Sequence, residues 1–164
     1  MKLKSMVIAA LLCALVTVVT ALAPISLGNL GYLNLGDAVI LLATGFIGPL
    51  YMIFVAGIGS ALADLLLGYS HYAFFTLLIK AMEGFVVAYL LQKMKFPVYL
   101  CYLVGIVIMT IAYATVDFLF FSSIAVFFNS LLANSIQGLL AYLAACLLLP
   151  LVKLSLGKMT HGTE

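Results

Sequence analysis

The sequence contains no arginine, and only 7 % of its 164 residues carry a charge. Seven lysines and five acidic residues give a formal net charge of +2, which is too small and too scattered for a nucleic-acid-binding surface. By contrast, 67 % of the residues are hydrophobic and the mean hydropathy is +1.35. A soluble domain of this size does not need so much apolar material to fill its core. The composition therefore indicates an integral membrane protein and excludes a nucleic-acid partner.

Metal and catalytic motifs are also missing. The three cysteines, Cys13, Cys101 and Cys146, each lie within an apolar run, without the spacing of a metal site. They are expected to be buried apolar residues, and neither a metal nor a cofactor is expected. The segment GIGSA, residues 57–61, faintly resembles a serine-hydrolase turn, yet no histidine lies in the interior of a predicted span to act as its base. We therefore expect no enzymatic activity.

The first 23 residues combine two lysines, an apolar core and an A-x-A ending, as a signal peptide does. The apolar core is longer than the 7–15 residues usual for a signal. We therefore interpret this segment as a retained first membrane span.

Glycine, proline and polar residues divide the chain into apolar segments, each predicted to be a helix because backbone groups in lipid must be paired within the segment. The predicted spans are residues 4–23, 36–47, 49–68, 71–93, 96–118 and 123–153. The second is too short to cross about 30 Å of hydrocarbon squarely, so it should be tucked among its neighbours or continue at an angle into the third. The sixth is long enough to tilt or to project beyond the bilayer. The predicted fold is an all-α membrane protein, a compact bundle of six transmembrane helices in one domain, residues 1–164.

The lysines predict the orientation of this bundle. Six of them flank spans on one side, whereas the loops 24–35, 69–70 and 119–122 on the other side contain none. By the positive-inside rule the lysine side is cytoplasmic, which places both termini in the cytoplasm. The flanking lysines are Lys2, Lys4, Lys93, Lys95, Lys153 and Lys158.

Five charged residues fall within or at the ends of the spans: Asp37, Asp64, Lys80, Glu83 and Asp117. Charges in lipid are costly, so each is a candidate functional residue. The spacing of Lys80 and Glu83 allows a salt bridge along one helix face, with Lys80 reaching toward the floor of a cavity or toward Asp64. Asp37 is well placed to cap its helix. We expect Asp37, Asp64 and Glu83 to be structural, and Asp117 to contact a ligand.

The last three spans each carry a polar stripe at helical spacing. Such stripes either line a cavity that opens to the outside or bond to one another as interhelical contacts, and the stripes alone leave both possibilities open. The residues are Thr76, Lys80 and Glu83, then Thr110, Tyr113 and Asp117, and finally Ser130, Asn134 and Gln137.

Two outer loops, residues 24–34 and 68–72, combine tyrosines with amides and hydroxyls. This mixture suits a flat heteroaromatic ligand, through stacking and directed hydrogen bonds. The alternative is the belt of tyrosines that forms at any membrane interface. The predicted ligand contacts are Asn34, Tyr69, His71, Lys80, Tyr113, Asp117, Asn134 and Gln137.

Small residues in the first span predict a close helix contact. Ala10 and Ala14 form an A-x-x-x-A pattern that lets two backbones approach. The pattern does not distinguish a partner within the chain from another subunit.

Residues 34–84, NLGDAVILLATGFIGPLYMIFVAGIGSALADLLLGYSHYAFFTLLIKAMEG, contain the series N-x-GD, GP, GxGSAxAD, GY and K-x-x-EG. This series resembles that of vitamin-binding S components of energy-coupling factor (ECF) transporters. The resemblance is nearest to the hydroxymethylpyrimidine- or pyridoxine-type branch of the riboflavin-type group. The shared motifs cover about a third of the chain. The predicted topology is similar over the whole chain.

The resemblance implies that a vitamin or its precursor is captured at the outer face of a bacterial cytoplasmic membrane, by spans four to six and the outer loops. It also implies association with a membrane T component and two cytoplasmic ATPases, the first span docking on the T component through Ala10 and Ala14. The chain has no G-x-x-x-x-G-K-[ST] loop of its own to bind ATP.

The ligand and the mode of transport leave alternatives. Carboxylates at the outer face would suit an aminopyrimidine or a protonated pyridine better than an anion, whereas the family also includes carriers of other vitamins, such as riboflavin. A stand-alone proton-coupled carrier is the main rival, because Lys80, Glu83 and the acids form a possible proton relay. It would need a second copy, since the chain shows no inverted repeat.

Overall fold

The structure is a computed structural model of the whole chain, and it describes residues 3–22, 24–26 and 32–161. Side chains are described for 3–22, 24 and 34–154, so Lys2, the Lys158 side chain and most of the predicted rim loop 24–34 lie outside the described residues. The elements are α1 (Leu3–Leu22), β1 (Ile25–Ser26), β2 (Tyr32–Leu33), α2 (Gly36–Ala43), α3 (Pro49–Met52), the π-helix η2 (Ile53–Ile58), α4 (Gly59–Leu66), α5 (Ser70–Gln92), α6 (Val98–Phe121) and α7 (Ile124–His161).

The described part of the chain confirms a helical bundle, in which five of the six predicted spans are long apolar helices. Five helical segments are long and apolar enough to cross a membrane: Leu3–Leu22, Pro49–Leu66, Ser70–Gln92, Val98–Phe121 and Ile124–Leu154. The second predicted span is only the eight-residue α2, because the turn that includes Gly45 and Gly48 ends the helix too early. The prediction that this segment is tucked among its neighbours is confirmed.

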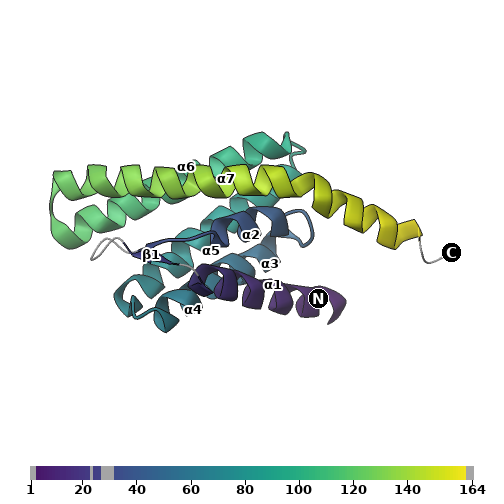
Figure 1. Cartoon of the computed structure of the whole chain (residues 1–164), viewed down its shortest axis with the longest axis horizontal. Helices are drawn as coiled ribbons and strands as arrows, with labels where there is room; N and C mark the ends of the chain where they lie inside the picture. The colour runs from purple at the N-terminus through teal and green to yellow at the C-terminus, as the bar shows by residue number, and fades with distance from the viewer. Residues whose placement is uncertain (1–2, 23, 27–31, 162–164) are drawn as a thin grey trace.

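Helix α2 lies between α1 and α7 (Figure 1). Successive residues of a helix are about 100° apart, so neighbouring residues of α2 face different parts of the bundle. Ile40 packs in a core with α1 and the third span, and Leu41 packs in a second core with α5, α6 and α7, both fully buried. The Gln92 amide of α5 donates to the backbone oxygens of Thr44 and Ile47, at 2.6 Å each. These bonds satisfy carbonyls at the C-terminal end of α2 that have no helical partner.

The third span is not a regular α-helix. It starts with Pro49 at its first turn and then passes through η2, a feature that the sequence did not predict. Its small residues bring backbones together within the chain, as their composition predicts. A Cβ at Gly57 would lie 2.8 Å from the Leu77 oxygen of α5, and one at Gly59 would lie 2.9 Å from the Cys13 oxygen of α1. A side chain at either position would push α5 or α1 away.

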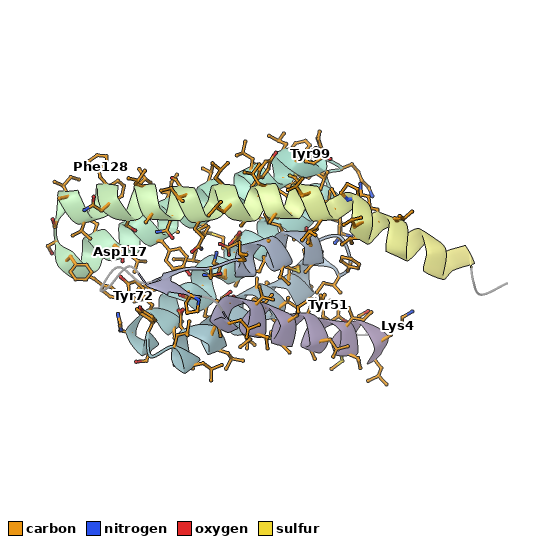
Figure 2. All side chains as sticks on the ribbon, in the orientation of Figure 1. Lys4, Tyr51, Tyr72, Tyr99, Asp117 and Phe128 are labelled. Carbon is orange, nitrogen blue, oxygen red and sulfur yellow. The ribbon has the colours of Figure 1, made fainter. Side chains whose placement is uncertain are left out.

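The two ends of the bundle differ. Helix α1 begins and α7 ends at the same end of the molecule (Figure 1), where Lys4 also lies (Figure 2). Tyr72 and Asp117 lie toward the opposite end, near the short antiparallel β1–β2 ladder. Helix α7 projects beyond the bundle and contains Pro150, which removes one helical hydrogen bond. Which end faces the cytoplasm stays a prediction.

Candidate ligand-binding site

A polar pocket opens among α1, α4, α5, α6, α7 and Asn34, which lies between β2 and α2. The pocket is narrow. The part of it that water can enter has a volume of about 50 Å³, which is room for a few water molecules. Its lining contains hydroxyls, amides and charged groups: Thr20, Asn34, Ser60, Asp64, Tyr69, Tyr72, Thr76, Lys80, Tyr113, Asp117, Asn134 and Gln137. The polar stripes of α5, α6 and α7 thus meet in a cavity, and those of α5 and α6 also bond to each other.

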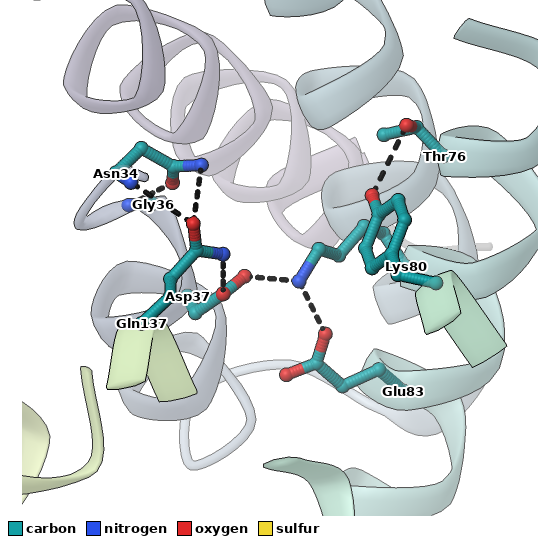
Figure 3. Close-up of polar contacts among 8 residues, drawn as sticks. Asn34, Gly36, Asp37, Thr76, Lys80, Glu83 and Gln137 are labelled. Atoms are coloured by element: carbon teal, nitrogen blue, oxygen red, sulfur yellow. Dashed lines mark hydrogen bonds and ion pairs between the residues drawn. The ribbon is translucent and has the colours of Figure 1, made fainter. Parts of the chain in front are cut away.

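Lys80 stands at the centre of a buried ion-pair network (Figure 3). Its ammonium group bonds to Asp37 of α2 and, at 2.9 Å, to Glu83 one turn along α5. All three side chains are at least 96 % buried. The predicted Lys80–Glu83 salt bridge is confirmed. Lys80 also lines the pocket, as expected, and its further ion-pair partner is Asp37 of α2.

Gln137 connects this network to the residues before α2 (Figure 3). Its amide nitrogen donates to Asp37 at 2.8 Å, and its amide oxygen accepts from the Asn34 backbone N–H at 3.0 Å. The Asn34 side chain accepts from the Gly36 backbone N–H at 2.8 Å. Asn34 is therefore the residue that satisfies a free donor at the start of α2. The capping interaction expected of Asp37 is replaced, in the contacts described, by Lys80 and Gln137.

The part of the pocket nearer the β1–β2 ladder, called its outer part below, is built around Asp117 (Figure 2). The Tyr72 hydroxyl of α5 donates to one oxygen of Asp117, and both side chains are buried (Figure 2). The Tyr113 hydroxyl bonds to Thr76 at 3.0 Å, and the Tyr113 ring centre lies 5.6 Å from the Lys80 ammonium. Tyr72 and Tyr113 thereby present ring faces and fixed hydroxyls from two adjacent helices.

The structure brings every predicted ligand residue into the lining except His71. His71 is exposed, and its ring faces Tyr69, Tyr72 and Phe120. The reason is helical geometry, because the pocket-facing positions of α5 are Tyr72, Thr76 and Lys80 at intervals of four residues. His71 is offset from that face by about 100°.

Several lining residues were missed as ligand contacts. Tyr72 and Thr76 could have been found, because they continue the four-residue spacing that ends at Lys80. Thr20 and Ser60 carry no such signal, since they reach the pocket only because α1 and α4 pack beside it. Asp64, predicted to be structural, also lines the pocket. Of the predicted stripes, Thr110, Ser130 and Glu83 lie outside the lining.

A polar pocket enclosed by the helices of a multi-pass membrane protein is typical of substrate-binding transport proteins. Residues 1–155 match the family described as ECF-type riboflavin transporter, S component, and the chain belongs to that family. It is 34 % identical over 131 residues to a Pyrococcus woesei protein described as an uncharacterized protein in a gap 3' region. That alignment covers 76 % of this chain and 87 % of the relative.

Family membership confirms the predicted transporter class. The chain is a membrane-embedded substrate-binding subunit with a vitamin-transport role, and it is not an enzyme. S components of ECF transporters work with T and ATPase modules. The family match does not identify the vitamin, the branch of the family or the composition of the complex.

Proposed function

We propose that the protein captures a small heteroaromatic vitamin or vitamin precursor, similar to hydroxymethylpyrimidine or pyridoxine, at the outer membrane face. It would deliver this ligand inward as the S component of an ATP-driven transporter with a T component and two ATPases. The observation that carries the proposal is the pocket in which tyrosine rings, amides and carboxylates converge from α5, α6 and α7. Such a lining supplies both stacking faces and oriented hydrogen bonds.

The proposed ligand contacts are the predicted residues that line the pocket: Asn34, Tyr69, Lys80, Tyr113, Asp117, Asn134 and Gln137. The narrow interior favours one aromatic ring over three. A single pyridine or pyrimidine ring requires less separation of α5, α6 and α7 than the tricyclic ring system of riboflavin. For this reason we place riboflavin second, although the family is described by that vitamin.

The first test is binding to the purified full-length chain in lipid nanodiscs. Calorimetric titrations with hydroxymethylpyrimidine, pyridoxine and riboflavin should show one-to-one binding of a single-ring compound. Tyr113→Ala should weaken that binding at least tenfold, because it removes a ring from the lining. The matched control is Tyr99→Ala, since Tyr99 is exposed and lies outside the pocket. Tightest binding of riboflavin would favour the second candidate.

The exposed side of α1 is a suitable docking surface for another membrane subunit. Ala10 and Ala14 are exposed, whereas Ala9 and Val16 pack against the chain's own bundle. Ala10→Leu should abolish ATP-dependent uptake in liposomes that contain the complete complex, while ligand binding by the isolated chain stays unchanged. Ala125→Leu, an equally exposed alanine on α7, is the control. Loss of binding in Ala10→Leu would argue against a docking role.

The same liposomes separate the proposal from a stand-alone proton-coupled carrier. Uptake that requires both the T component and ATP hydrolysis supports the S-component assignment. Uptake by the purified chain alone, driven by a pH gradient, would contradict it.

A further inference from the structure

The described side chains around the pocket include more acidic groups than basic ones. Lys80 is the basic side chain in the described lining, and Asp64 and Asp117 are the acidic ones. Behind Lys80 stand two further carboxylates, Asp37 and Glu83, both completely or almost completely buried. If every group carries its usual charge, four carboxylates surround one ammonium group in a region of low dielectric constant.

The Lys80 ammonium is already engaged. It bonds to Asp37 and to Glu83, so its positive charge is neutralised at the inner edge of the pocket. An ammonium group has three donors, and at least two are used within the chain. A ligand anion would therefore have to compete with two carboxylates for Lys80 while approaching Asp64 and Asp117.

Asp117 lies in a different environment. The partner that the structure shows for it is the neutral Tyr72 hydroxyl, which occupies one carboxylate oxygen. A carboxylate can accept several hydrogen bonds, so acceptor capacity remains. The side chain is 2 % exposed and lines the pocket. Burial of a carboxylate is costly unless a positive charge or donors face it, and a ligand in this pocket can provide them.

A second observation points to a ligand in the same pocket. Thr20 of α1 is only 3 % exposed and lines the pocket, and its hydroxyl has no hydrogen-bond partner within the described chain. Buried hydroxyls are nearly always bonded. Thr20 thus offers a donor and an acceptor on the α1 side of the pocket, beside Gly36 and Asn34 at the start of α2.

We propose that the ligand of this pocket is a heteroaromatic cation, with its positive charge on an exocyclic ammonium group such as an aminomethyl substituent. The inference rests on the proposed function and narrows its substrate class. Asp117 is the main counter-charge and Asp64 adds to the negative potential. Specificity against anions comes from repulsion by the same carboxylates.

The test uses three compounds that differ only at one ring substituent: pyridoxamine, pyridoxine and 4-pyridoxic acid, which present an ammonium, a hydroxyl and a carboxylate. They are titrated into the purified full-length chain in nanodiscs of a zwitterionic lipid at neutral pH. Pyridoxamine should bind at least tenfold more tightly than pyridoxine, and 4-pyridoxic acid at least a hundredfold more weakly than pyridoxamine.

Variants assign this preference to Asp117. Asp117→Asn keeps the shape and should remove the preference for pyridoxamine, whereas Asp117→Glu keeps the charge and should retain it. Thr115→Val on the same helix is the matched control, since Thr115 is exposed and bonds only to its own helix in the contacts described. Thermal unfolding of each variant confirms that it is folded before it is titrated.

The results also distinguish this inference from the proposed function. Equal or tighter binding of pyridoxine, 4-pyridoxic acid or riboflavin overturns the charge preference and leaves vitamin capture in place. An Asp117→Asn variant that keeps the full preference overturns the role of Asp117. If neither these compounds nor hydroxymethylpyrimidine binds, both the inference and the proposed function fail.

Discussion

The two groups of buried polar residues in this protein are built differently. At the inner edge of the pocket Lys80, Asp37, Glu83 and Gln137 bond to one another. Toward the outer end Asp117 meets a neutral tyrosine hydroxyl rather than a lysine. Most charges of the inner group are therefore compensated by partners within the chain, whereas the outer group presents its carboxylate to the pocket.

This difference separates buried charges that stabilise the fold from a buried charge that is available to a ligand. The inner ion pairs connect α2 to α5, and Gln137 adds α7, so removal of one member leaves other charges buried without compensation. The outer group connects fewer elements. Substitutions should therefore lower stability at the inner group and alter ligand affinity at the outer group, and four experiments test this contrast.

The largest effect is expected for Lys80→Met, which keeps the length of the side chain and removes its charge. Asp37 and Glu83 would then stay buried without their cation, and the free energy of unfolding should fall by about 3–5 kcal/mol. Thermal unfolding in nanodiscs measures this loss, with Thr115→Val as the control. Unchanged stability with weaker ligand binding would show instead that Lys80 serves the ligand rather than the fold.

A smaller loss is expected for Gln137→Leu, which removes the amide between Asn34 and Asp37. The Asn34 N–H and one Asp37 oxygen would lose a partner, at about 1–3 kcal/mol for each group that stays buried. Asn134→Leu on the same helix is the comparison, because its amide bonds to Ser130 of its own helix. If the two variants unfold at the same temperature, the interhelical role of Gln137 is wrong.

The packing of α2 is tested by Gly36→Ala. A Cβ at Gly36 would lie 1.9 Å from the Thr20 hydroxyl oxygen and 2.9 Å from the Asn34 side-chain oxygen, so both groups must shift. Overpacking of this kind typically costs about 1–3 kcal/mol. Gly48→Ala is a clean control, since no atom outside its own backbone lies within 4 Å of the added carbon. Equal stability of the two variants would contradict the close approach of α1 and α2.

The smallest change in stability is expected for Tyr72→Phe in the outer group. The loss of one hydrogen bond to Asp117 should lower the free energy of unfolding by about 1 kcal/mol. Binding should change more visibly, because the Asp117 carboxylate would no longer be held in one orientation. A titration of pyridoxamine should show a several-fold change in affinity. A variant that loses as much stability as Lys80→Met would erase the distinction between the two groups.

Much of the site was predictable because helical spacing determines which residues share a face. The stripes of α5, α6 and α7 predicted Lys80, Tyr113, Asp117, Asn134 and Gln137, and all of them line the pocket. His71 was misplaced because its loop position suggested the rim, whereas the start of α5 turns it away. Thr20 was missed because nothing local indicates which neighbour a threonine on a membrane span will meet.

The sequence by itself determined the helical membrane class, the short second segment and the Lys80–Glu83 contact. These features depend on hydropathy, segment length and spacing within one helix, which are local properties of the chain. Only the tertiary structure decided that Asp37 pairs with Lys80, that Gln137 reaches Asp37, and that Asp117 receives a tyrosine hydroxyl. These partners are 43, 100 and 45 residues apart. No local pattern specifies such contacts, because they depend on how whole helices pack.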